Sequence, residues 1–306
     1  MKVIVRYLLC WMLCLTAASV CAADIAVVSS ERTAGYMEAL DSLVSELGKS
    51  NLPVTDVDLA SGPGKSALFG SQRPKVIVTL GSEALRQVLE LDLRLPVLAV
   101  LIPRTAYERI VRSAAARANV SALYLDQPVS RQLDLIRIAF PAAHKVGVLW
   151  GEDSIAQQAA VNTMALGRGL MLIDRTVGRG RTVAGELNDV LDGAEVFLAV
   201  PDPQVFNPNT LSNVLMSTYR SRVPLVGFSP AYVRAGATLS LHSLPTQAGA
   251  RAAVMVRQFL TSGVLPASQY PLDFSIGVNE RVARSLEMPL DANALTEQLK
   301  RMERRP

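Results

Sequence analysis

Short apolar runs alternate with amphipathic stretches along the chain from residue 25 onward. An apolar run bounded by turn residues predicts a buried strand, and apolar residues three or four apart predict a helix. In the first part of the chain, these patterns predict strands over 25–28, 54–59, 76–80 and 96–102, and helices over 36–47 and from Ser82. Such a rhythm indicates a parallel sheet with right-handed crossovers and helices on both faces.

The same rhythm restarts after Asn119. It predicts helices over 132–139, 155–166, 211–219, 246–260 and 278–286, and strands over 145–150, 170–174, 195–200, 224–228, 237–241 and 271–276. One local echo, RLPVLAV at 94–100 and RVPLVGF at 222–228, favours a duplicated design. Because this pattern is also common before buried strands, the echo alone leaves duplication open. The basic tail, 300–306, is typical of a solvated chain end.

The first residues have the layout of a secretory signal peptide. Lys2 and Arg6 precede an uncharged run over 7–20, and small residues follow it. This order predicts a cleaved segment over 1–22, with cleavage one residue later as an alternative. A membrane anchor is the other interpretation, but the uncharged stretch is at the lower limit for a spanning helix. The expected location is therefore the bacterial periplasm.

All three cysteines, Cys10, Cys14 and Cys21, fall in this segment. The exported chain would then have no thiol, and its core alone would hold it together. Lipid attachment at Cys21 is a further alternative. It is disfavoured because Val20 stands where a small residue normally precedes the modified cysteine.

Composition narrows the class of protein. A chain of 306 residues suggests two domains, and 50% hydrophobic with 19% charged residues excludes a disordered chain. Aromatic residues make up only 5%, which argues against a stacking platform for nucleic acid. The net charge of +4 includes Lys2 and Arg6, so the exported chain is nearly neutral. Two histidines and no remaining cysteine make a metal site unexpected.

A hydrolase motif is only partly present. Residues 227–231 approach the G-x-S-x-G elbow around Ser229. The hydrolase order requires an acid and then a histidine after the serine, but no acid lies between Ser229 and His242. We therefore expect neither catalysis nor a cofactor. An exported α/β hydrolase remains an alternative.

Polar residues gather where the predicted strands end. In an open parallel sheet, ligands bind beyond the carboxyl ends of the strands. The residues with this position are Ser30, Glu31, Ser82, Tyr124, Trp150, Asp153, Asp202 and Ser229. Asp202 or Glu31 suits an ammonium group, and the Trp150 and Tyr124 rings suit an apolar body. The set fits a small zwitterion, although each residue is also explained as a helix cap or loop residue.

Four stretches carry a resemblance to a known family: ALYLDQPVSRQ (122–132), FPAAHKVGVLW (140–150), AVPDPQVF (199–206) and VPLVGFSPAYVRAGATLSL (223–241). Gly249 also fits. The sequence resembles the ABC-transporter substrate-binding proteins of the type I periplasmic fold, in the branch that includes tryptophan- and tyrosine-type receptors. The resemblance covers nearly all of the exported chain.

The resemblance implies an α/β fold of two Rossmann-like lobes with parallel sheets, joined by crossing segments near 119–124, 241–244 and 268–273. The expected lobes are 23–120 plus 242–270, and 121–241 plus 271–306.

The resemblance also places Thr79 and Ser82 where the first lobe contacts ligand, and Asp202 and Ser229 where the second does. The corner at 79–82, Pro103–Arg104 and His242–Ser243 depart from the family pattern, so the ligand's identity does not transfer.

The function implied is capture of a small polar solute, an amino acid or similar, between the lobes. The solute would pass to an inner-membrane ABC permease, and the binding protein would act as a monomer. Closure follows from the ligand's greater affinity for the closed form, and no bond is made or broken. A periplasmic sensing module for a membrane signalling protein is the alternative, since nothing in the chain separates the two.

Overall fold

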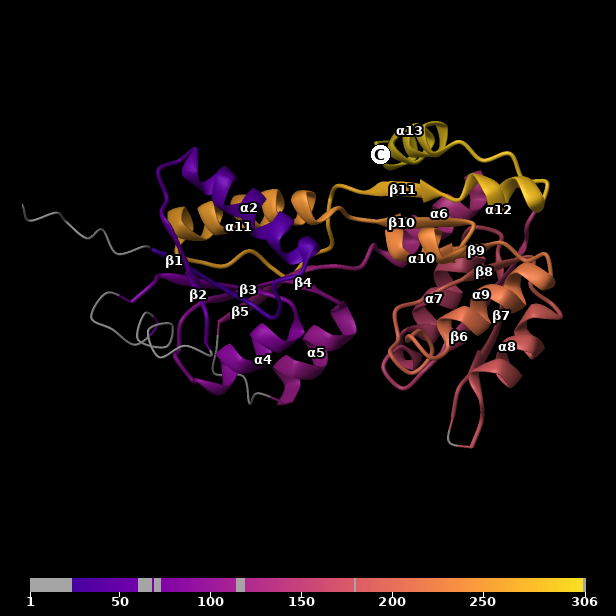
Figure 1. Ribbon diagram of the computed structural model, residues 1–306, viewed down its shortest axis with the longest axis horizontal. Coiled ribbons are helices and arrows are strands. Elements are labelled where there is room, and N and C mark those ends of the chain that lie inside the picture. The colour runs from indigo at the N-terminus through magenta and orange to yellow at the C-terminus, as the bar shows by residue number, and fades with distance from the viewer. Residues whose placement is uncertain (1–23, 60–67, 69–72, 114–118, 179, 305–306) are drawn as a thin grey trace, which may run out of the picture.

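Two α/β units make up the structure, each built on its own sheet (Figure 1). The computed structural model describes residues 24–59, 68, 73–113, 119–178 and 180–304. The expected signal peptide, 1–22, lies outside these residues. In the part of the chain that is described, no helix has the length and apolar character needed to cross a membrane.

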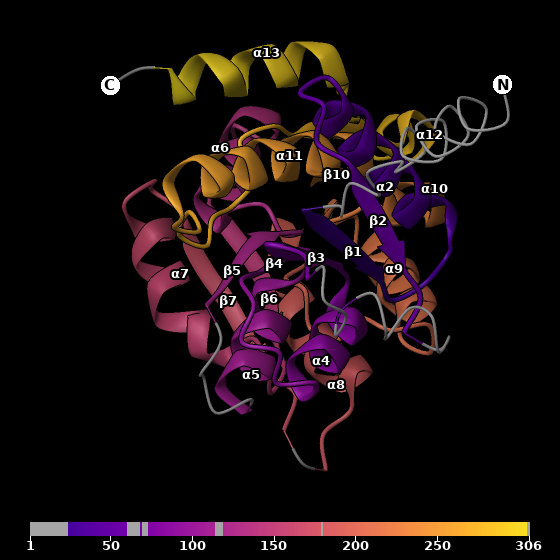
Figure 2. The same ribbon diagram turned by 90° about the vertical axis from the view of Figure 1, so that its left-hand side faces the viewer.

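The first sheet is parallel, with the strand order β2-β1-β3-β4-β5 among the described residues. Its strands are β1 (Ile25–Ser29), β2 (Val54–Val57), β3 (Val76–Leu80), β4 (Val97–Ile102) and β5 (Val120–Tyr124). Helices α2 (Ala34–Gly48) and α11 (Pro245–Ser262) cover one face, and α4 (Ser82–Glu90) and α5 (Arg104–Ser113) cover the other (Figures 1 and 2). The strands are continuously apolar because both faces are covered.

The second sheet has the order β11-β10-β9-β8-β6-β7 within the described ranges. Its strands are β6 (Lys145–Trp150), β7 (Met171–Thr176), β8 (Val196–Leu198), β9 (Leu225–Gly227), β10 (Leu239–His242) and β11 (Ser275–Val278). The accompanying helical segments are α6 (Val129–Ala139), η2 (Ile155–Gln157), α7 (Gln158–Leu166), α8 (Val183–Leu191), α9 (Leu211–Arg220), α10 (Pro230–Ala235), α12 (Glu280–Ser285) and α13 (Ala292–Glu303). Apart from antiparallel β11, the winding repeats that of the first sheet. The predicted pair of similarly wound α/β lobes is confirmed.

Each unit has its own hydrophobic core on both faces of its sheet. In the first, Leu43 and Val256 belong to the α2–α11 face, and Leu85 and Ala99 to the α4–α5 face. In the second, one cluster joins β6 and β8 to α6, α7 and α13, and another joins them to α8 and α9. Because separate cores stabilise the two units, they can reorient without loss of either core.

Strand β5 belongs to the first sheet, where it pairs with β4. The expected division placed residues 121–124 in the second lobe, and this pairing joins them to the first instead. The chain then passes between the lobes at 125–128. It returns at 243–244, between β10 and α11, and crosses again at 271–274, before β11.

The basic tail is ordered as far as helix α13 extends. Leu295 and Leu299 are buried against the second core, and Glu303 pairs with Arg131 of α6. Residues 301–304 are exposed, as expected of a solvated end, but the chain is helical to Glu303, which the sequence pattern did not predict. The apolar spacing at 295 and 299 was the signal for this helix.

Candidate functional site

The helix that follows β4 of the first lobe contacts the loop that follows β6 of the second lobe. Arg109 on α5 of the first lobe pairs with Asp153, which follows β6 of the second, at 2.5 Å between guanidinium nitrogen and carboxylate oxygen. The carboxyl ends of parallel strands are the usual ligand-binding edge of such sheets. The facing edges are therefore the candidate site.

On the first lobe, Ser30, Gly81 and Ser82 lie together where β1 and β3 end. The Ala84 N–H in the first turn of α4 donates to Ser30 Oγ at 2.8 Å, so Ser30 caps this helix. Gly81 has a φ of 93°, and a methyl group there would lie 2.6 Å from both Ser30 Oγ and Tyr36 Oη. Only glycine fits this corner, which sets Ser82 at the start of α4.

Thr79 is fully buried in β3, and its hydroxyl has no hydrogen-bond partner. A buried hydroxyl without a partner normally costs free energy. Glu31, beyond β1, is exposed. Burial raises the pKa of Tyr36, and the negative charge of Glu31 raises it further.

Tyr124, at the end of β5, forms part of an aromatic cluster. Its ring lies 5.7 Å from that of Tyr107 and 5.1 Å from that of Tyr270, both edge-to-face. Tyr124 is 9% exposed, and burial raises its pKa. The cluster packs β5 against the segment before the third crossing. The Tyr124 ring therefore packs within this junction, and it does not present an exposed face to a ligand.

Trp150 was expected to cover a ligand, and the structure places it elsewhere. Its side chain is fully buried in the second core with Val146 and Val148, which alternate with it along β6. The indole N–H donates to Asp174 Oδ2 at 2.6 Å. In this structure the ring is core, because a strand of period two turns residues 146, 148 and 150 to the same covered face.

Asp202 holds the loop that carries Asp153. Its carboxylate accepts from the Ser154 N–H at 2.9 Å and from the Gln204 N–H at 2.8 Å, and it is 3% exposed. A methyl group at Gly151 would lie 2.3 Å from Asp202 Oδ1. The carboxylate therefore fixes the loop at the end of β6, a role that sequence reasoning did not assign.

Ser229 immediately precedes α10 and is partly exposed, with no capping bond from its side chain. His242, considered above as its catalytic partner, has its Nδ1 3.1 Å from Ser240 Oγ instead. Its contact is therefore with a serine two residues away on the same strand, buried beside the crossings.

Side chains of the crossing segments hold one another. Gln127 Nε2 donates to Ser243 Oγ at 2.7 Å, and Ser243 Oγ donates to the Asp273 carbonyl at 3.0 Å. Arg131 donates to Gln127 Oε1 and to the Pro271 carbonyl. All three crossings are thus linked through largely buried polar groups. Sequence reasoning missed Gln127 and Arg131, although both lie in one of the stretches that carried the resemblance.

Comparison with known proteins identifies the family. The model of the ABC transporter substrate binding protein family matches residues 65–297, well over half of the chain. The chain belongs to this family. A search of curated proteins finds no significant match.

Solved structures share the fold of this substrate-binding protein. An ABC domain from Streptococcus pneumonia in complex with L-Trp is 16% identical, with a TM-score of 0.59, and 89% of this chain and 98% of that one are covered. A ligand-free, open substrate-binding protein with adhesive properties from Clostridium difficile is 16% identical with a TM-score of 0.69, covering 88% and 96%. A periplasmic ribose ABC transporter protein from Conexibacter woesei is 12% identical with a TM-score of 0.51, covering 89% and 96%.

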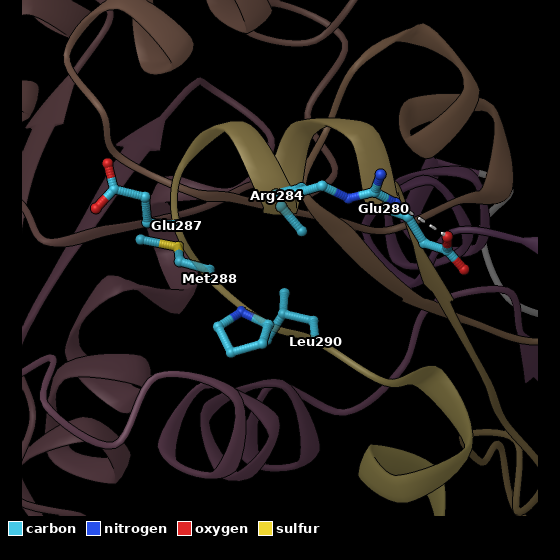
Figure 3. Close-up of a pocket in the computed structure, with 7 residues that line it drawn as sticks. Glu280, Arg284, Glu287, Met288 and Leu290 are labelled. Carbon is cyan, nitrogen blue, oxygen red and sulfur yellow. Dashed lines mark ion pairs between the residues drawn. The ribbon is translucent and has the colours of Figure 1, made fainter.

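Surface hollows of this substrate-binding protein lie on both lobes. One of about 430 Å³ lies under the loop after α12 and is lined by Arg284, Met288 and Leu290 (Figure 3). Another, of about 420 Å³, adjoins the strand ends at Ser29 and Ser30 and is lined also by Gln87 and Glu90. Only the second adjoins the candidate site. Among the described residues, no group of three or more His, Cys, Asp or Glu side chains could hold a metal.

In this substrate-binding protein, two titratable groups beside the crossings change the stability of the fold with pH in opposite directions. Burial lowers the pKa of His242 to about 4, with the charge of Arg234 as a second cause. Burial raises the pKa of Asp126 to about 6, against the hydrogen bond it accepts from the Arg104 N–H. His242 thus stabilises the fold above about pH 6.5, and this contribution is lost as pH falls towards 4. Asp126 stabilises the fold below about pH 4, and this stabilising contribution is lost as the pH rises through 6.

His242→Gln and Asp126→Asn should therefore change the pH dependence of stability in opposite directions. When the pH is lowered from 7.5 to 5, protonation linked to His242 lowers the free energy of unfolding by about 2 kcal/mol. Protonation of Asp126 raises it by about 1 kcal/mol over the same range. On this change of pH, the free energy of unfolding of His242→Gln should fall less than that of the parent. The free energy of unfolding of Asp126→Asn should fall more than that of the parent. Urea unfolding at the two pH values measures both changes. Parallel curves for parent and variants would contradict the two shifts.

Proposed function

We propose that this protein captures a small polar solute, an amino acid or a similar zwitterion, between its two lobes and delivers it to an inner-membrane ABC permease. Members of the family bind small solutes and deliver them to such permeases. Binding and delivery require no chemical change in the solute. The observation that carries the proposal is the pair of similarly wound lobes, which contact each other through Arg109 of α5 and Asp153 after β6.

The lobes proposed here follow the sheets. The first comprises 24–124 with 245–270, and the second comprises 129–242 with 275–303. The crossings at 125–128, 243–244 and 271–274 are the proposed hinge, held by Gln127 and Ser243. Export through the segment 1–22 and action as a monomer complete the proposal.

Among the residues expected at the site, Thr79, Ser82 and Ser229 are proposed to contact the solute. The Thr79 hydroxyl supports this because it is buried, at a strand end, and without a partner. The α4 N-terminus at Ser82 favours a carboxylate. Ser30 and Asp202 are proposed to support these groups, since their oxygens already accept backbone N–H groups.

A thermal-shift panel of amino acids, nucleosides and small sugars tests solute capture. A solute present at 100 times its dissociation constant stabilises the folded form by about 2.7 kcal/mol. For a protein of this size, we expect such a solute to raise the melting temperature by about 5 °C or more. If no solute in the panel shifts the melting temperature, the proposal fails.

In the same assay, Thr79→Val distinguishes an effect on solute binding from an effect on folding stability. The substitution removes a buried hydroxyl that has no partner, so the solute-free protein should keep or gain stability. Its affinity for the solute should nonetheless fall. Thr218→Val is the matched control, because Thr218 is equally buried but its hydroxyl donates to the Val214 carbonyl at 2.9 Å. That variant should lose stability and keep its solute affinity.

A further inference from the structure

An ion pair spans the two lobes at a point away from the crossings. Arg109 lies five residues along α5 from Arg104, whose backbone N–H is bound by Asp126 of the first crossing. Five helical residues correspond to about 7.5 Å. We propose that Arg109 and Asp153 form an electrostatic latch that favours the closed orientation of the lobes and thereby sets the affinity for the captured solute. The affinity part of this inference rests on the proposed function.

The second lobe presents Asp153 on a fixed loop. The Gly151 N–H donates to Ser154 Oγ at 3.0 Å, and the Glu152 N–H donates to Gln204 Oε1 at 2.9 Å. The Ser154 N–H is held by Asp202, as described above. Backbone groups on both sides of Asp153 are therefore bound within the second lobe. Its side chain, 21% exposed, projects to Arg109 of the other lobe.

The first lobe leaves Arg109 available for this partner. Neighbours three and four residues away on a helix are the ones that can pair with it. For Arg109 these are Thr105, Ala106, Arg112 and Ser113, and none is acidic. The nearby acid Glu108 pairs with Arg104, at 2.6 Å. Glu108 is therefore engaged within α5, and Arg109 pairs with Asp153 of the other lobe.

The size of the effect follows from the exposure of the pair. Arg109 is 58% exposed, so water and salt screen the interaction. A pair of this kind shifts an equilibrium by about two- to fivefold. The apparent affinity of a ligand scales with the populated fraction of the binding-competent state. When that fraction is small, loss of the latch should therefore raise the solute's dissociation constant by about the same factor.

The solute-free test is a distance measurement between the lobes. The mature chain is expected to have no cysteine, so Glu90→Cys on α4 and Asn188→Cys on α8 can carry spin labels for pulsed electron resonance. Arg109→Gln and Asp153→Asn should both lengthen and broaden the label distance. The parent in 1 M NaCl should approach the same distribution, whereas Arg109→Gln should no longer respond to salt.

Charge reversal sharpens the test. Arg109→Glu should open the lobes further than Arg109→Gln, and adding Asp153→Arg should restore the parental distance. Arg112→Gln is the matched control, an exposed arginine on the same helix that should leave the distance unchanged. Equal label distances in the parent, Arg109→Gln and Asp153→Asn would overturn the latch.

Solute titration completes the test with the solute that gives the largest thermal shift. Arg109→Gln and Asp153→Asn should weaken binding about two- to fivefold. A much larger loss confined to Asp153→Asn, with unchanged solute-free distances, would instead make Asp153 a solute contact and overturn the latch. If no solute binds at all, the proposed function fails, while the solute-free distances still decide the latch.

Discussion

Replacing Asp202 with alanine is expected to cost about 3 kcal/mol of stability and to abolish solute capture. The carboxylate accepts two backbone N–H groups in a nearly closed environment. Hydrogen bonds to a charged group contribute about 1.5–3 kcal/mol each, and alanine would leave both donors unpaired. The loop that follows β6 would lose its anchor, and Asp153 would lose its position.

Chemical unfolding and the thermal-shift panel together measure this prediction. Asp202→Asn keeps one acceptor and should fall between the parent and the alanine variant. Asp189→Ala is the matched control, since Asp189 is an acid of the same lobe that is 59% exposed. Parental stability and parental solute binding in Asp202→Ala would show that the carboxylate does not hold the loop.

Gly249→Ala should destabilise the first lobe by about 3 kcal/mol. Helices α11 and α2 approach closely at this residue, and a methyl group would lie 2.2 Å from the Ala39 carbonyl oxygen and 2.9 Å from Ser42 Cβ. The obstacle is backbone, so the helices must separate, at a cost at the upper end of the overpacking range. Separation would also stretch the 2.8 Å hydrogen bond from Ser42 Oγ to the Thr246 carbonyl.

The control for this prediction is Gly48→Ala, in the last residue of α2. A methyl group there meets nothing within 4 Å, so this variant should match or slightly exceed the parent in stability. Urea unfolding followed by far-UV circular dichroism compares the two. A Gly249→Ala variant as stable as Gly48→Ala would mean that the two helices are less closely packed than described.

Local pattern predicted most of the fold. Apolar runs such as 76–80 and 145–150 became central strands because both sheets are covered on both faces, which makes such runs distinctive. Helix α5 was not predicted. Its charged residues obscured a spacing in which Ala106 and Tyr107 are buried.

The candidate site was only partly predictable. Its location at the strand ends follows from the topology, whereas the role of each side chain depends on partners far along the chain. Asp202 binds Ser154, 48 residues away, and Gln127 binds Ser243, 116 residues away. Trp150 is different, because alternation with Val146 and Val148 already placed it on a covered face. Its position next to the predicted strand end made it resemble a ligand contact.

Small-angle X-ray scattering with and without the solute that gives the largest thermal shift tests the central claim most directly. If the two lobes close around that solute without reacting with it, its addition should lower the radius of gyration, and mass spectrometry should recover it unchanged. An unchanged radius at saturating solute, or a chemically altered solute, would contradict this account.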